Sequence, residues 1–246
     1  MDEMIYTAMT GAIQTEYAQA INSNNLANIS TTGFRADLHS FSSIPIEGPG
    51  VESRVNAVVD SYGTDFAQGP IMNTGRDLDI AIRGEGFIAV QAADGTEAYT
   101  RAGDLRVEPG GLLSTGGGYL VMGDGGPVAL PPNVSLLVGG DGTISVQPLG
   151  QGPETLTIAD RIKLVNPDPA LLDKGVDGLF YLEEGAIADA DAGVKVTAGA
   201  LEQSNVNTAM TLVNMIELAR QYEMQVNIIK TAEENADAAA QMMSLG

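Results

Sequence analysis

Both ends of the chain lack the residues that break helices, and this pattern constrains the fold more than any other feature. After Gly199 no proline or glycine occurs before Gly246, and residues 4–28 contain a single glycine, Gly11, and no proline. Proline removes a backbone donor and glycine disfavours helix, so segments without them favour long helices. The sequence predicts an N-terminal helix within residues 1–32 and a C-terminal helix within residues 204–246, with which it pairs.

Apolar residues recur three and four apart in both segments, as on one face of a helix. The N-terminal stripe is narrow and is typical of a coiled-coil seam; it consists of Tyr6, Met9, Ile13, Ala20 and Ala27. The C-terminal stripe keeps heptad spacing and consists of Leu212, Met215, Ala219, Tyr222, Val226, Ile229, Ala236, Ala240 and Met243. A second, looser apolar set lies on another side and consists of Val206, Met210, Val213 and Met224.

A helix that is apolar on two sides needs two neighbours. The N-terminal helix can supply one neighbour, and we expect another chain to supply the other. An ordinary intramolecular hairpin is the alternative. The predicted assembly interface comprises Tyr6, Met9, Ile13, Leu26, Leu212, Met215, Ile216, Tyr222, Val226 and Ile229.

Between the two predicted helices the pattern changes to short strands. Prolines and glycines interrupt residues 33–69, which we interpret as an extended linker region with one or two short strands. Residues 70–185 alternate apolar and polar residues between glycine-rich turns, as antiparallel strands do. A return linker is expected over residues 186–203. The predicted fold is therefore α+β: a discontinuous, coiled-coil-like terminal helical region plus a central, mainly antiparallel β domain.

Charge and composition exclude several classes of function. The formal net charge of −20 opposes binding to nucleic acid. There is no cysteine, so disulfides and thiolate metal sites are impossible. No apolar run approaches the ~20 residues that span a bilayer, so a transmembrane protein is not predicted. The acidic N-terminus is not followed by an apolar segment, so a cleaved signal peptide is not expected either.

Three features suggest chemistry but fit it poorly. Residues 84–89 match a glycine-rich dinucleotide fingerprint, yet a strand rather than a helix is expected to follow. His39 is the only histidine and has no visible catalytic or zinc-binding companions. Residues 189–193 resemble the start of a calcium loop, but Ala200 stands where the bidentate glutamate would be. We therefore predict no catalytic, cofactor or metal site, and no enzyme.

Several short segments together resemble flagellar rod and hook proteins. Residues 24–35 are similar to the signature that closes the N-terminal helix of that family, and residues 199–207 to the start of its C-terminal helix. Segments 66–69, 78–84 and 99–103 resemble its middle domain. The motif residues near the two helices are Asn25, Leu26, Ala27, Asn28, Thr32, Gly33, Phe34, Ser204, Asn205, Val206 and Asn207.

The resemblance implies a structural axial subunit of the bacterial flagellar basal body. Residues 231–237 and the chain length resemble proximal rod proteins most, with a distal rod or other axial protein as the alternative. The implied partners are other rod proteins, copies of this chain and the flagellar export apparatus. The implied location is the periplasm-spanning rod, where the terminal helices transmit torque and enclose the export channel. A secreted β-rich binding module or adhesin with a helical stalk is the alternative from another class.

Overall fold

The computed structural model describes residues 2–45, 55–148, 156–182 and 185–244. The chain divides into two compact units, and each is assembled from segments distant in sequence. Unit 1 consists of Met1–Asn28, Asp37–Thr64 and Val206–Gly246. Unit 2 consists of Ile29–Ala36 and Asp65–Asn205.

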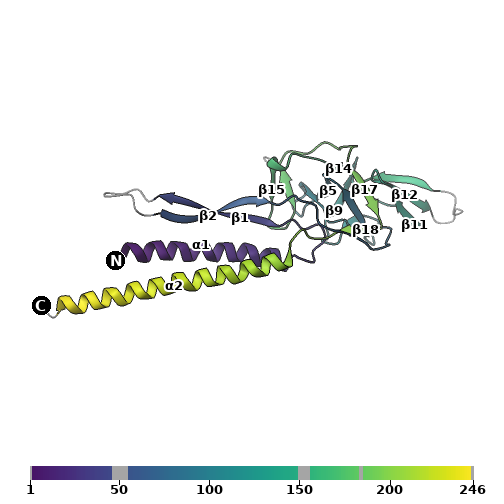
Figure 1. The fold of residues 1–246 in the computed structure, drawn as a ribbon. Helices are drawn as coiled ribbons and strands as arrows, with labels where there is room; N and C mark the ends of the chain where they lie inside the picture. Colours follow the sequence, from purple (N-terminus) through teal and green to yellow (C-terminus); the bar gives the residue numbers. More distant parts are fainter. Residues whose placement is uncertain (1, 46–54, 149–155, 183–184, 245–246) are drawn as a thin grey trace. The chain divides into compact units, whose positions relative to one another are not determined.

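Unit 1 contains the two long helices. Helix α1 spans Asp2–Ala27 and helix α2 spans Thr208–Ser244. They lie side by side and run in opposite directions (Figure 1). The Asn207 side chain accepts a hydrogen bond from the Met210 backbone N–H at 3.1 Å, which caps the start of α2.

A two-stranded hairpin completes unit 1, and its strands are longer than the one or two short strands predicted in the linker. Strands β1 (Asp37–Pro45) and β2 (Val55–Thr64) pair antiparallel, with an irregularity after Leu38. The prolines and glycines that suggested an irregular linker occur at the end of β1 and in residues 46–54, which lie outside the described residues.

Unit 2 is built from short antiparallel strands joined by turns. Their bounds are β3 Ile71–Asn73, β4 Ile80–Arg83, β5 Phe87–Gln91, β6 Glu97–Thr100, β7 Leu105–Val107, β8 Leu113–Thr115, β9 Leu120–Gly123, β10 Gly126–Pro127, β11 Asn133–Val138, β12 Thr143–Pro148, β13 Thr157–Arg161, β14 Leu164–Val165, β15 Leu172–Lys174, β16 Phe180–Leu182, β17 Lys195–Ala198 and β18 Ala200–Glu202. A 3₁₀ turn, η1, covers Pro169–Leu171. Helices α1 and α2 together with these strands confirm the predicted α+β class.

Strand β5 lies at the centre of the main sheet of unit 2. In the described part of the chain this sheet has the order β15-β16-β6-β5-β9-β8-β7, with β10 beside β9 and β14 beside β5. A smaller sheet has the order β11-β12-β13. Ile88 and Val90 of β5 are fully buried in the larger apolar cluster. Phe87 and Ala89, on the opposite face, belong to a second cluster with Phe180.

The return segment is more ordered than predicted. Strand β17 pairs with β4, and β18 pairs with β3. Residues 195–202, expected as part of a linker, are therefore integral to unit 2. Within these residues Val196, Ala200 and Glu202 are buried. Glu202 is the only charged residue among the buried ones, and it forms ion pairs inside unit 2.

Candidate assembly interface

The seam between α1 and α2 is made mainly of small and polar residues. On α1 the buried positions include Ala8, Ala12, Thr15, Ala18 and Asn22. On α2 they are Thr211, Leu218 and Ala232. Small side chains let two helices approach closely, but they remove little apolar surface from water. The seam therefore contributes modestly to stability through burial.

Amide side chains cross this seam at two levels. Asn22 Nδ2 donates to the Thr211 carbonyl at 2.8 Å, a buried bond. Gln225 Nε2 donates to Thr15 Oγ1 at 3.3 Å. Gly11 makes room for Gln225, because a Cβ atom at this glycine would lie 2.9 Å from Nε2. These contacts fix which residues of α2 lie opposite which residues of α1.

Large apolar side chains lie on the outside of this helix pair. Tyr6, Met9 and Ile13 are 64%, 44% and 41% exposed. The predicted coiled-coil stripe on α1 is therefore not the seam; the seam uses neighbouring positions that carry alanine, threonine and asparagine. The spacing correctly identifies an apolar face of α1, but it does not show what packs against that face. Helix α2 packs instead against the small and polar residues of α1.

Helix α2 repeats this arrangement. Among the predicted interface residues, Leu212, Ile216, Tyr222 and Val226 are exposed, whereas Leu26 of α1 and Met215 and Ile229 of α2 are half-buried. The second apolar set is also exposed at Met210, Val213 and Met224. The outward residues thus occupy more than one side of α2, as a helix with several neighbours requires.

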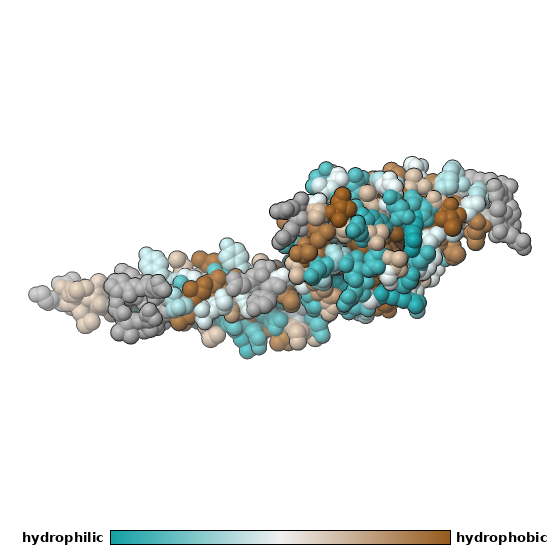
Figure 2. All heavy atoms as spheres, turned by 90° about the horizontal axis from the view of Figure 1, so that it is seen from above, coloured by the Kyte–Doolittle hydropathy of each residue, from teal (hydrophilic) through white to brown (hydrophobic). Residues whose placement is uncertain are grey.

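The β1–β2 hairpin packs on α1 and also presents apolar side chains. Gln14 Oε1 accepts a hydrogen bond from the Val59 N–H, and Asn25 exchanges two hydrogen bonds with the Asp37 backbone. Phe41 and Ile44 remain about half exposed. Figure 2, which views the molecule from the side of this hairpin, shows hydrophobic residues among hydrophilic ones there.

Three charged side chains form a buried cluster inside unit 2, which we call the buried ion-pair cluster: Arg35, Arg101 and Glu202. Arg35 Nη2 lies 2.6 Å from Glu202 Oε1, and Arg101 Nη1 lies 3.1 Å from Oε2. The side chains of Arg35 and Glu202 are fully buried and that of Arg101 is 4% exposed. Buried charges of this kind persist only when paired and hydrogen-bonded.

The remaining polar atoms of the cluster mostly find backbone partners. Arg35 Nη1 donates to the Ala67 carbonyl at 2.6 Å, and Arg101 Nη2 donates to the Gly84 carbonyl at 2.8 Å. Burial lowers the pKa of the Arg35 guanidinium, whereas the Glu202 carboxylate raises it and so opposes the shift. One carboxylate thus compensates two buried guanidinium groups.

Family-motif residues surround this cluster. Gly33 adopts φ +67° and donates its N–H to the Glu202 carbonyl at 2.8 Å. Asn205 accepts from the Ala36 N–H at 2.8 Å and donates to the Asp65 carbonyl at 2.8 Å. The motif that follows α1 and the motif that precedes α2 are therefore joined to each other within unit 2.

The sequence did not lead us to predict the ion pairs of Glu202 with Arg35 and Arg101. Arg35, Arg101 and Glu202 each occur in a separate segment that resembles the family, but no periodic pattern connects positions so far apart. The available signal was a charged residue within each of three otherwise uncharged motif cores. Single charges of opposite sign in buried segments point to pairing.

The features that suggested chemistry have structural roles. Strand β5 begins at Phe87, so the glycine-rich residues 84–86 form a turn between strands, as predicted. His39 lies in β1, with its ring edge-on to Phe41. Asp191 accepts a hydrogen bond from the Gly193 N–H in a tight acidic turn.

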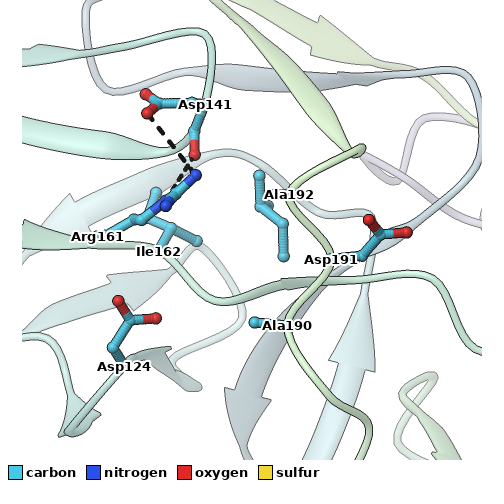
Figure 3. A pocket seen from close by; sticks show the side chains of 8 residues that line it. Asp124, Asp141, Arg161, Ile162, Ala190, Asp191 and Ala192 are labelled. Carbon is cyan, nitrogen blue, oxygen red and sulfur yellow. Dashed lines mark hydrogen bonds and ion pairs between the residues drawn. The ribbon is translucent and has the colours of Figure 1, made fainter.

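A cavity of about 250 Å³ in unit 2 is lined by three aspartates and one arginine (Figure 3). Arg161 Nη2 lies 3.7 Å from Asp141 Oδ2, and both side chains are more than 40% exposed. A hydrogen bond from Thr143 lowers the pKa of Asp141. The charges are solvated, and in the described residues no cluster of three or more His, Cys, Asp or Glu side chains is arranged to hold a metal.

Family comparisons agree with the order of the motifs along the chain. Residues 5–35 match the family model described as Flagella basal body rod protein. Residues 81–146 match the Flagellar hook protein FlgE/F/G D1 domain, and residues 197–242 match the Flagellar basal body rod FlgEFG protein C-terminal. The flagellar basal-body rod protein FlgF of Escherichia coli is 39% identical, and the match covers the full length of both chains.

The chain belongs to the flagellar basal-body rod protein family. FlgF of Salmonella typhimurium is also 39% identical over the full length of both chains. The rod protein FlgG of Buchnera aphidicola is 31% identical and aligns with 97% of this chain. The prediction of a structural axial subunit of the rod, most similar to FlgF, is confirmed. As a member of this family, the protein assembles with other rod proteins in the basal body of the flagellum. Neither described helix of this rod protein is long and apolar enough to cross a membrane.

Proposed function

We propose that this rod protein polymerises through the outward apolar faces of unit 1, so that α1 and α2 pack against neighbouring subunits, transmit torque and enclose an export channel. The observation that carries the proposal is the distribution of side chains on the helix pair. Small and polar residues face inward, and Tyr6, Ile13, Leu212 and Ile216 face outward.

The energetic argument follows from exposed area. Burying one large apolar side chain contributes roughly 1.5–3 kcal/mol, and each subunit presents many of them on its helices. Leaving such residues in water would be costly for an isolated chain, whereas neighbouring subunits can cover them. A subunit that uses different faces in a head-to-tail contact forms a helical polymer when the rotation between neighbours does not close into a ring.

The proposed partners are copies of this chain and other rod proteins, with the flagellar export apparatus as the delivery route. Delivery without a cleaved signal peptide and a periplasm-spanning location remain part of this proposal. A non-enzymatic role is proposed as well, because the carboxylates at the cavity of unit 2 are solvated rather than poised for proton transfer.

The test is Val226→Asp, which places a charge on the outward face of α2, where Val226 is 43% exposed. We expect polymerisation with other rod proteins to be lost while unit 2 remains folded, since an unpaired charge would become buried at the contact. Asn227→Asp is the matched control, because it adds the same charge at the neighbouring exposed position.

Sedimentation and electron microscopy of mixtures with other rod proteins provide the readout. Normal tubes from the Val226→Asp protein would contradict the assigned face. A secreted binding module instead predicts a soluble monomer or small oligomer that forms no tubes under any mixture.

A further inference from the structure

The amide contacts in the α1–α2 seam have a property that stability does not explain. Asn22 is 4% exposed, and the Oε1 atom of Gln225 is buried without a hydrogen-bond partner. A buried unsatisfied acceptor costs free energy, and an apolar side chain at either position would avoid that cost. Residues that weaken a packed seam are retained where they specify one arrangement over others.

The rest of the seam cannot specify an arrangement. Ala8 and Thr15 are seven residues apart on α1, as are Gly11 and Ala18, so sliding α2 by one heptad would bring similar small side chains opposite it. The two amide contacts are different, because each joins one particular pair: Asn22 with the Thr211 carbonyl, and Gln225 with Thr15. After such a slide Gln225 would lose both its hydrogen bond and the space above Gly11.

We infer that Asn22 and Gln225, with Thr15 and Gly11 as their receptors, select the register of α1 on α2. Apolar contact cannot set this register, because it is not directional. The selective element must therefore lie in the polar contacts of the seam.

Disulfide trapping tests the register, and the chain has no cysteine of its own. Ala18 and Leu218 are both buried in the seam between the two amide levels. We expect Ala18→Cys with Leu218→Cys to cross-link at least about tenfold faster than Ala18→Cys with Thr211→Cys, a pair shifted by one heptad. In an Asn22→Ala, Gln225→Leu background the preference should fall to about twofold or less.

The control is Gln221→Leu, which makes the same kind of change at an exposed position of α2 and should leave the preference intact. Circular dichroism shows whether each variant keeps its helices. An unchanged preference in the double variant, or no preference in the parent, would overturn the inference. Because the cross-link forms within one soluble chain, this result is independent of whether the chain polymerises.

Discussion

The buried ion-pair cluster allows a quantitative prediction for Glu202→Gln, which removes the only acidic charge of the cluster and preserves its shape. Arg35 and Arg101 would then face each other across a neutral amide with at most 4% of either side chain exposed. Breaking a buried pair by removing one partner costs about 3–5 kcal/mol. The surviving bonds to the Ala67 and Gly84 carbonyls place the expected loss near the lower value.

A loss of about 3 kcal/mol corresponds to a fall in Tm of about 6–12 °C for a unit of this size. Differential scanning calorimetry follows the melting of unit 2, and near-ultraviolet circular dichroism includes the signal of its buried Tyr99. Glu85→Gln is the matched control, because Glu85 is an exposed glutamate of the same unit. Its Tm should stay within about 2 °C of the parent, since exposed charges contribute little.

The cluster contains two cations and one anion, and this ratio predicts which variants lose more stability. Arg101→Met leaves Arg35 and Glu202 as a balanced pair, so it should cost less than Glu202→Gln, which leaves two unbalanced cations. A Tm change of less than 2 °C for Glu202→Gln, or a larger loss for Arg101→Met, would refute the electrostatic reasoning.

Three further predictions follow from particular contacts. Gly33→Ala should lower the free energy of unfolding by at least about 2 kcal/mol in urea titrations, because a Cβ at φ +67° would lie 2.3 Å from the Arg101 carbonyl carbon. Gly75→Ala is the control: its φ is +72°, but no atom lies within 4 Å of the added Cβ, so the free energy of unfolding should fall by less. Burial raises the pKa of Tyr99 to about 12. The contribution of Tyr99 to the free energy of unfolding should therefore be fully present below pH 10 and fall by about 2 kcal/mol as the pH rises towards 12. Tyr99→Phe should remove this loss in denaturation experiments at different pH values. In the isolated chain the helical signal at 222 nm should be lost in a calorimetric transition at a lower temperature than that of unit 2, because the helix seam buries few large side chains. A single cooperative transition would contradict this.

The helices were predictable because helix formation depends on local properties: absence of breakers, apolar spacing and the Asn207 cap. The faces on which α1 and α2 pack together were not predictable in this way. A hydrophobic pattern identifies the apolar side of a helix, and in this chain that side faces away from the partner helix. The actual seam, with Thr15, Asn22 and Ala232, resembles a solvated face in sequence.

The hairpin and the buried ion-pair cluster depend on contacts between distant residues. Strands β1 and β2 form only because Asp37 to Pro45 meet Val55 to Thr64 across the intervening residues, and prolines there suggested an irregular linker. Arg35 and Glu202 are separated by 167 residues, so their pairing cannot be inferred from spacing. What sequence did indicate was that both belong to family-like motifs and hence to one recurrent structure.

The buried ion-pair cluster also makes pairing of α1 with α2 easier, through chain connectivity alone. Asn22 and Thr211, which meet in the seam, are 189 residues apart. Once the Gly33 N–H has bonded the Glu202 carbonyl in a folded unit 2, only about 20 residues remain to be closed between them. The closure entropy grows with the logarithm of loop length, so this shortening favours helix pairing by about 2 kcal/mol. Glu202→Gln should therefore slow trapping of the Ala18→Cys, Leu218→Cys pair in proportion to the fraction of unit 2 that is unfolded, although Glu202 belongs to the other unit. An unchanged trapping rate in the Glu202→Gln protein, at a temperature where its unit 2 has melted and its helices have not, would show that the helices find each other without it.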